Sequence, residues 1–198
     1  MMTKSSGTIL DGAERRSEGR GPRTGRDKRF AGVALVVALI GAAGCWLAAP
    51  SFAAAAKPAA FKLTPAILAE PPVKVVALAP KGSLHDPYTG NAKIAKEGHK
   101  LFFHYGCNGC HGGGGGGGMC PPLINGVWIY GGSDDTLFRL ISLGSTKLQA
   151  KGYQREALEN VIGPMPQMGL LIPHANDVFK IITWIRSAYQ GPPNHKYH

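Results

Sequence analysis

Apolar residues recur at helical spacing in two long stretches of the chain. Between residues 91 and 105, and again between residues 175 and 189, they fall on one face of a helix with polar residues on the other. A third, shorter helix is predicted over residues 136–143, because a cap and an acidic first turn precede it and Gly144 follows as a stop. These elements predict an all-α fold, a small helical domain with long loops.

The stretches between these helices lack sustained periodicity. Residues 54–90 contain six prolines, which prevent long helices and leave extended or turn backbone. We therefore expect a Pro-rich N-terminal extension that is partly ordered at most, with a short strand over 73–78 as its one candidate element. The glycine run at 112–118 interrupts all regular structure. Residues 145–173 are expected to form loops, apart from a short helix near 154–160.

The N-terminal part has the organisation of an export signal. Residues 4–29 are polar and basic, residues 30–49 carry no charge, and small residues precede a predicted cleavage site after Ala53. The uncharged stretch is also long enough to span a bilayer, so an uncleaved membrane anchor is the alternative. Both interpretations place the remainder outside the cytoplasm, because the positive charge stays inside. We expect a periplasmic protein with a signal peptide or anchor (1–53), the extension (54–90), the helical domain (91–191) and a C-terminal tail (192–198).

The chain has 198 residues and a formal net charge of +10. Fourteen basic and eight acidic residues follow Ala53, so the predicted mature part is basic as well. Its lysines are scattered, and no arginine-rich stripe or aromatic platform accompanies them, which argues against a nucleic-acid partner. The charge favours docking to an acidic protein or to an anionic membrane surface, with a merely soluble basic surface as the alternative.

The candidate chemistry lies directly after the first long helix, at Cys107-Asn108-Gly109-Cys110-His111. Two thiols three residues apart can both add to the vinyl groups along one edge of a haem, and the adjacent histidine can then bind the iron. A zinc site would need two more ligands, yet the only other cysteine nearby is Cys120 and no paired histidines follow. A thioredoxin-like thiol pair would need a βαβ setting, which the helical pattern does not provide. The sequence therefore predicts one covalently bound haem c with His111 as an iron ligand.

The helices on either side of this motif resemble the terminal helices of class I cytochromes c. Gly98 and Phe102 precede the motif as in the N-terminal helix of that family, and Ile181-x-x-Trp184-Ile185 resembles its C-terminal helix. The resemblance implies the class I cytochrome c fold around one covalent haem. In that fold the glycine lets the two terminal helices cross closely, and aromatic residues pack at the crossing.

The same resemblance implies a second axial ligand. Low-spin electron carriers of this family use a methionine sulfur, which keeps the redox potential high. The sequence Gly163-Pro164-Met165-Pro166 resembles their methionine loop and precedes the last helix by about the family's distance. Met165 is therefore the expected ligand, Met168 is the alternative, and Met119 lies too close to the cysteine motif to reach the opposite face of a haem.

Further contacts with the haem are implied for residues 121–130. Pro121 or Pro122 is expected to accept a hydrogen bond from the proximal histidine through its carbonyl group, and Leu123 is expected to pack on the haem ring. Trp128 and Tyr130 are expected either to bind a propionate through N–H and O–H or to pack in the core.

A narrower similarity is carried by residues 102–112, by the Pro-Leu-x-Asn-x-x-Trp-x-Tyr sequence at 122–130 and by the methionine loop. These sequences are similar to cytochromes c associated with methanol and other quinoprotein alcohol dehydrogenases, over about residues 86–190. The similarity implies a non-enzymatic carrier of single electrons from such a dehydrogenase toward a terminal oxidase. The alternatives are a haem enzyme or sensor with an open sixth position, and a membrane-anchored subunit of a respiratory complex.

Two features remain outside these functional assignments. Cys120 is expected to be a free thiol, or less simply a disulfide between two copies of the chain. The glycine run lacks the lysine and the serine or threonine of a phosphate-binding loop and does not lie between a strand and a helix. It is expected to form a flexible loop over the haem edge.

Overall fold

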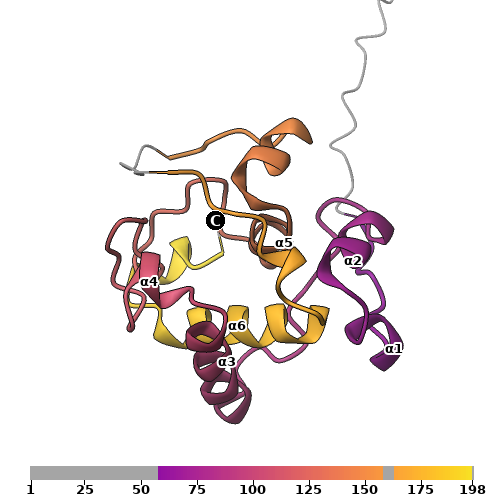
Figure 1. Ribbon diagram of the computed structural model, residues 1–198, viewed down its shortest axis with the longest axis horizontal. Coiled ribbons are helices and arrows are strands. Elements are labelled where there is room, and N and C mark those ends of the chain that lie inside the picture. Colours follow the sequence, from indigo (N-terminus) through magenta and orange to yellow (C-terminus); the bar gives the residue numbers. More distant parts are fainter. Residues whose placement is uncertain (1–57, 158–162, 198) are drawn as a thin grey trace, which may run out of the picture. The chain divides into compact units, whose positions relative to one another are not determined.

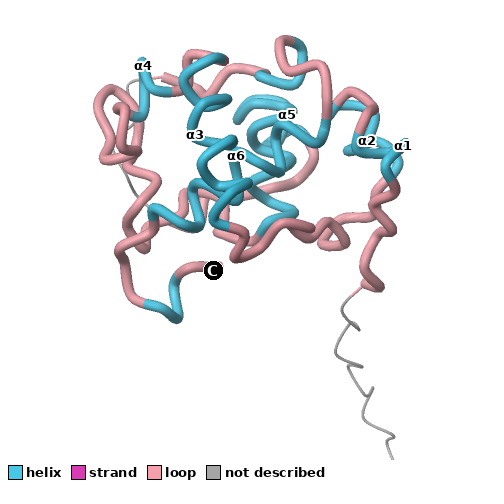
Figure 2. Tube along the Cα trace, turned by 90° about the horizontal axis from the view of Figure 1, so that it is seen from below, coloured by secondary structure: helices cyan, strands magenta, loops and turns pink. Residues whose placement is uncertain are grey.

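The computed structural model describes residues 58–157 and 163–197. Within these residues the protein is all-helical and contains no strand, as Figures 1 and 2 show, so the predicted all-α class is confirmed. The predicted signal peptide or anchor (1–53) lies outside the described residues. The elements are α1 (Pro65–Leu68), α2 (Pro72–Leu78), α3 (Ala92–His104), α4 (Asn108–His111), α5 (Asp134–Ala150), α6 (Ala175–Ala188) and the short 3-10 turns η1 (Met168–Leu170) and η2 (Pro193–His195).

Helices α3 and α6 correspond to the two stretches of strong periodicity and cross each other in the fold (Figure 1). Gly98 lies buried at the crossing. A β-carbon there would collide with the main chain of α6, so the close approach of the two helices requires glycine. The rings of Phe102 and Trp184 pack beside it with centroids 4.3 Å apart. This crossing of glycine and aromatic residues is the one that the resemblance to class I cytochromes c implies, and the all-helical architecture is consistent with that fold.

Helix α5 is longer than its predicted range. It begins after the Ser133 cap, whose hydroxyl accepts a hydrogen bond from the Thr136 N–H at 3.1 Å. Gly144 ends the first helical segment, as predicted, because its φ of +72 interrupts the helical backbone, but a second helical segment follows and continues to Ala150. The loop predicted from residue 145 therefore begins only after α5. Residues 154–157 are not helical, and the rest of the predicted helix at 154–160 lies outside the described residues.

The segment before α3 was expected to be partly ordered at most, and this expectation is wrong for residues 58–90. Val75 and Leu84 are fully buried against the rest of the core. The Arg139 side chain of α5 reaches across to this segment and donates hydrogen bonds to the carbonyl oxygens of Ala79 and Pro80, both at 2.8 Å. The segment is therefore an integral layer of the domain.

The short strand expected over residues 73–78 is also wrong, because these residues form α2. Prolines start both helices of the segment: Pro65 follows the capping Thr64, and Pro72 is the first residue of α2. Proline is well suited to the first helical position, where its missing N–H would have no partner in any case. Pro65 and Pro72 therefore mark helix starts in this segment.

None of the helices formed by residues 58–157 and 163–197 is both long enough and apolar enough to cross a membrane. The uncharged stretch 30–49, the candidate anchor, lies outside the described residues.

Candidate cofactor site

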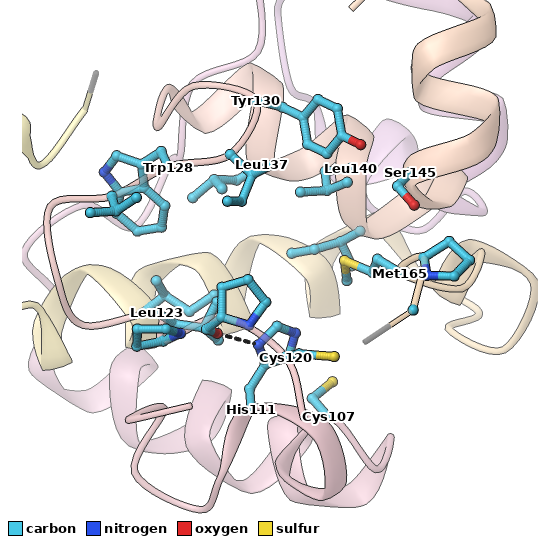
Figure 3. A pocket seen from close by; sticks show the side chains of 18 of the residues that line it. Cys107, His111, Cys120, Leu123, Trp128, Tyr130, Leu137, Leu140, Ser145 and Met165 are labelled. Atoms are coloured by element: carbon cyan, nitrogen blue, oxygen red, sulfur yellow. Dashed lines mark hydrogen bonds between the residues drawn. The ribbon is translucent and has the colours of Figure 1, made fainter. Parts of the chain in front are cut away.

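A cavity of about 370 Å³ lies between α4, α5 and the loop that carries Met165. Its volume is in the range of about 300–1,000 Å³ that is usual for small-molecule and cofactor pockets. Figure 3 shows the side chains that surround it, which are mostly apolar. Among them are Phe102, Leu123, Trp128, Leu137, Leu140, Ile141, Ile181 and Ile185. The cavity thus offers an apolar, partly enclosed space with a small number of polar groups.

His111, the last residue of α4, presents its ring to this cavity. Its Nδ1 lies 2.9 Å from the carbonyl oxygen of Pro121, the bond drawn as a dashed line in Figure 3. Because a carbonyl oxygen only accepts, Nδ1 carries the hydrogen and the lone pair is on Nε2. Burial lowers the pKa of His111, although the bond to Pro121 opposes this. The result is a neutral imidazole held in one orientation, the form that binds a metal ion.

The cysteines of the motif lie on the same turn as His111. Main-chain hydrogen bonds run from the N–H groups of Cys110 and His111 to the carbonyl oxygen of Cys107, at 3.3 and 3.0 Å. Cys107 lines the cavity, and its burial raises the pKa of its thiol to about 11. Cys110 lies on the α4 turn but is not part of the lining, whereas Cys120, which had no predicted role at the site, is.

Met165 contributes its sulfur from the side of the cavity away from α4, and Figure 3 shows it pointing inward. Its main chain is fixed to α5, because the Ser145 N–H donates to the Met165 carbonyl oxygen at 3.0 Å. The other two candidate methionines do not line the cavity: Met168 is buried in the core, and Met119 is 54% exposed. The geometry therefore favours Met165 over Met168 as the ligand candidate.

Gly144 makes this position of Met165 sterically possible. A β-carbon at residue 144 would lie 2.6 Å from the Met165 carbonyl oxygen, and the backbone has φ +72. The sequence showed Gly144 only as a helix stop. Its role at the site depends on which distant segment approaches it, so no local pattern could reveal it.

The other residues that were predicted to contact the cofactor also surround the cavity, and the polar groups of two of them have different hydrogen-bond partners. All five residues line the cavity: Pro121, Pro122, Leu123, Trp128 and Tyr130. Figure 3 shows Leu123 on the same side as His111, and Trp128 and Tyr130 on the opposite side. The Trp128 indole N–H donates to the His195 carbonyl oxygen at 2.7 Å, so this donor already has a partner within the chain. The Tyr130 hydroxyl accepts from the Gln149 amide at 2.9 Å and retains its own proton to donate. A propionate role stays a prediction, better suited to Tyr130.

Polar residues of the cavity that sequence reasoning missed are Ser145, Thr146, Gln149 and Arg155. The first three belong to the part of α5 beyond Gly144, which the sequence assigned to a loop. A polar residue on a helix follows the same sequence pattern whether it faces solvent or a cavity, so the sequence could not show that these side chains line the site.

The cavity's donor set suits a haem that is held by cysteine thioethers. An imidazole nitrogen and a thiol lie at one wall, a thioether sulfur lies at the other, and apolar side chains cover the space between them. Within residues 58–157 and 163–197, no group of three or more histidine, cysteine, aspartate and glutamate side chains is arranged to hold a metal ion on its own. The imidazole, the thiol and the thioether that line the cavity fit an iron that already carries the ring ligands of a haem.

Comparison with known proteins gives few matches. No protein-family model matches the chain. No curated protein matches it either. Among solved structures, the chain is similar to the crystal structure of cytochrome cL from the marine methylotrophic bacterium Methylophaga aminisulfidivorans, with 24% sequence identity and a TM-score of 0.42. The match covers 57% of this chain and 64% of that one, so the activity and partners of this chain are proposals.

Proposed function

We propose that this chain is an exported mono-haem c-type cytochrome, an electron-transfer protein without an enzymatic reaction of its own. The arrangement that supports this most is His111, fixed by the Pro121 carbonyl at one wall of an apolar cavity, with Met165 pointing into the same cavity from the other side. Cys107 and Cys110 lie on the helical turn that presents His111. They are the proposed points of covalent attachment.

The chain's own residues would hold and tune the cofactor. When bound, a haem c supplies an iron that changes its charge by one electron. Pro121 keeps the His111 ring in the tautomer that binds iron through Nε2, and such a bond increases the ligand's basicity. The Met165 sulfur would supply the second ligand from the protein, and the apolar walls would exclude water. With both ligands in place, electron transfer would be the remaining activity.

The proposed location and partners follow from the sequence. The N-terminal signal would deliver the domain to the periplasm, or would anchor it to the membrane through residues 30–49. The similarity of residues 102–112, 122–130 and 163–166 to cytochromes c of methanol and other quinoprotein alcohol dehydrogenases supports such an enzyme as electron donor. A terminal oxidase or another cytochrome would be the acceptor. The basic charge of the mature part supports an acidic docking partner.

The test is the optical spectrum of the protein purified from the periplasm, together with Met165→Ala and a matched control, Met168→Ala. We expect a low-spin c-type spectrum with the weak sulfur-to-iron absorption band of methionine ligation. The band should vanish in Met165→Ala, whereas Met168→Ala should keep it and lose about 2–5 kcal/mol of stability, because a buried methionine is truncated. A high-spin spectrum that shifts with carbon monoxide in the unmutated protein would instead support an enzyme or sensor.

A further inference from the structure

Two features of the chain have no part in the proposed function: the glycine run at 112–118 and the third cysteine of the site, Cys120. The structure brings them together. The glycine run leaves α4 directly after His111, turns back on itself and returns the chain to the same turn. Cys120 is the residue that arrives there.

The turn depends on glycine. Gly112, Gly115 and Gly117 all have positive φ values, of 74°, 73° and 94°. The Gly117 N–H donates to the His111 carbonyl oxygen at 2.9 Å, and a β-carbon at Gly112 would lie 2.8 Å from the Gly117 carbonyl oxygen. Side chains at such positions would be strained or would collide. The run is therefore a tightly folded loop with internal hydrogen bonds, which differs from the flexible loop that was expected.

The loop ends with Cys120 against Cys110. The Cys120 N–H donates to the Cys110 carbonyl oxygen at 3.2 Å, so the two cysteines are joined directly through their main chains. A direct main-chain hydrogen bond holds the two residues close together, and a disulfide needs Cα atoms about 4.4–6.8 Å apart. Cys107 and Cys120 both line the cavity, whereas Cys110 does not.

We propose that Cys110 and Cys120 form a disulfide in the haem-free chain, which withholds Cys110 from cofactor attachment until it is reduced. The oxidant is a disulfide such as oxidised glutathione. Its S–S bond breaks and the Cys110–Cys120 S–S bond forms, by way of a mixed disulfide. Two electrons pass from the two cysteine sulfurs to the oxidant, and the two thiol protons end on the two glutathione thiols that are released.

The disulfide links the redox state of the surroundings to the loading of the site. Oxidised chain keeps Cys107 free but has no thiol at position 110 to add to a second vinyl group. Reduction restores both thiols, and after attachment Cys120 is the free thiol that remains. Only this consequence rests on the proposed function, because the disulfide itself needs no haem.

The first experiment maps the thiols of the full chain produced without haem. The protein is equilibrated with oxidised and reduced glutathione, its free thiols are labelled with iodoacetamide, and the thiols released by reduction are labelled with N-ethylmaleimide. Mass-spectrometric fragmentation then reads each cysteine. We expect iodoacetamide on Cys107 and N-ethylmaleimide on Cys110 and Cys120. Iodoacetamide on Cys120 with a Cys107–Cys110 disulfide, or iodoacetamide on all three, would overturn the proposal.

The second experiment asks whether the glycine loop places Cys120. Gly112→Ala introduces a side chain at a positive φ and against the Gly117 carbonyl oxygen, whereas Gly114→Ala has open space around its β-carbon. We expect Gly112→Ala to lower the equilibrium constant for disulfide formation at least about tenfold, a shift of roughly 30 mV in reduction potential. Gly114→Ala should leave it unchanged. Equal constants in both variants would show that the folded loop does not create the disulfide.

A third measurement separates this inference from the proposed function. Haem and reductant are added to the oxidised chain, and thioether formation is followed by mass. We expect attachment at both Cys107 and Cys110 only with reductant. If the Cys110–Cys120 disulfide is found but haem never attaches, the disulfide stands and the cytochrome proposal fails. Attachment at Cys110 without reductant would overturn the proposed withholding, even with the disulfide mapped.

Discussion

Gly98 in α3 lies so close to Lys180 in α6 that a β-carbon at position 98 would be 1.9 Å from the Lys180 carbonyl oxygen. The obstacle is main chain, which cannot move aside as a flexible side chain could. The backbones of the two helices therefore touch at this point. Their crossing also positions Phe102 of α3 and Ile181 of α6, which both line the cavity.

Gly98→Ala should therefore destabilise the protein by about 3 kcal/mol or more, since overpacking of a well-packed core costs roughly 1–3 kcal/mol even where side chains can adjust. The free energy of unfolding in urea measures this. Gly114→Ala is the matched control, because nothing lies within 4 Å of its added carbon, and it should change stability by less than about 0.5 kcal/mol. Similar stabilities for the two variants would show that α3 and α6 do not cross as described.

The crossing was predictable because its signals are local. Helical periodicity marks both helices, and a single glycine with nearby aromatic residues marks their contact. The segment before α3 was missed for the opposite reason. Its prolines act as helix starts only because Thr64 and Pro71 precede them in the right conformation. Its attachment to α5 depends on Arg139, about sixty positions further along the chain, which no local pattern connects to it.

The candidate site also has features that the sequence predicts and features that it does not. The spacing of Cys107, Cys110 and His111 is itself the chemical signal, and the structure presents Cys107 and His111 to one cavity. Two other relationships arise only when distant segments meet: Gly144 against the Met165 loop, and Cys120 against Cys110. Backbone approaches of this kind depend on tertiary geometry, so the sequence could show the residues but not their contacts.

Gly144→Ala should disturb the site through Met165. The new β-carbon would stand at a positive φ and 2.6 Å from the Met165 carbonyl oxygen, so the loop must shift away from α5. We expect loss or shift of the methionine band in the haem-loaded protein and a loss of stability of about 1–3 kcal/mol. Gly163→Ala, in the same loop but with no atom within 4 Å, is the control. An unchanged band in Gly144→Ala would contradict the positioning role.

Arg139→Met should detach the N-terminal layer from α5. Arg139 is 5% exposed, and its guanidinium pairs with Asp135 at 2.8 Å and donates to the carbonyl oxygens of Ala79 and Pro80. Removing it leaves a buried carboxylate without its cation, which typically costs about 3–5 kcal/mol. Urea unfolding gives the loss, and hydrogen exchange of residues 76–84 shows where it acts.

The control for Arg139→Met is Lys74→Met, which removes an exposed pair with Glu70. Exposed pairs of this kind contribute at most about 1 kcal/mol. The double variant Asp135→Asn with Arg139→Met should recover part of the loss, because the uncompensated charge is then gone. If the single variants at 139 and 74 cost the same, the buried pair does not hold the segment in place.

Asp86 should make stability depend on pH. Burial raises its pKa to about 6 from an ordinary value of 3.8, and the hydrogen bonds from the Tyr88 N–H and the Thr183 hydroxyl offset this only in part. The Thr183 oxygen lies 2.8 Å from Asp86 Oδ2 and 2.9 Å from the Phe179 carbonyl oxygen, but its hydroxyl has one proton for both. A protonated Asp86 can donate to Thr183, which then donates to Phe179, so both contacts are made.

Because the folded-state pKa lies above the unfolded value, the folded state binds the proton more tightly. The stability that this provides is present below about pH 4 and is lost as the pH rises through about 6. Asp86→Asn, whose amide N–H₂ can donate to Thr183 at every pH, should remove this dependence. Free energies of unfolding between pH 4 and 7.5 should show the wild type losing about 2–3 kcal/mol relative to the variant as the pH rises. A constant difference between the two proteins over that range would mean that Asp86 titrates alike in the folded and unfolded states.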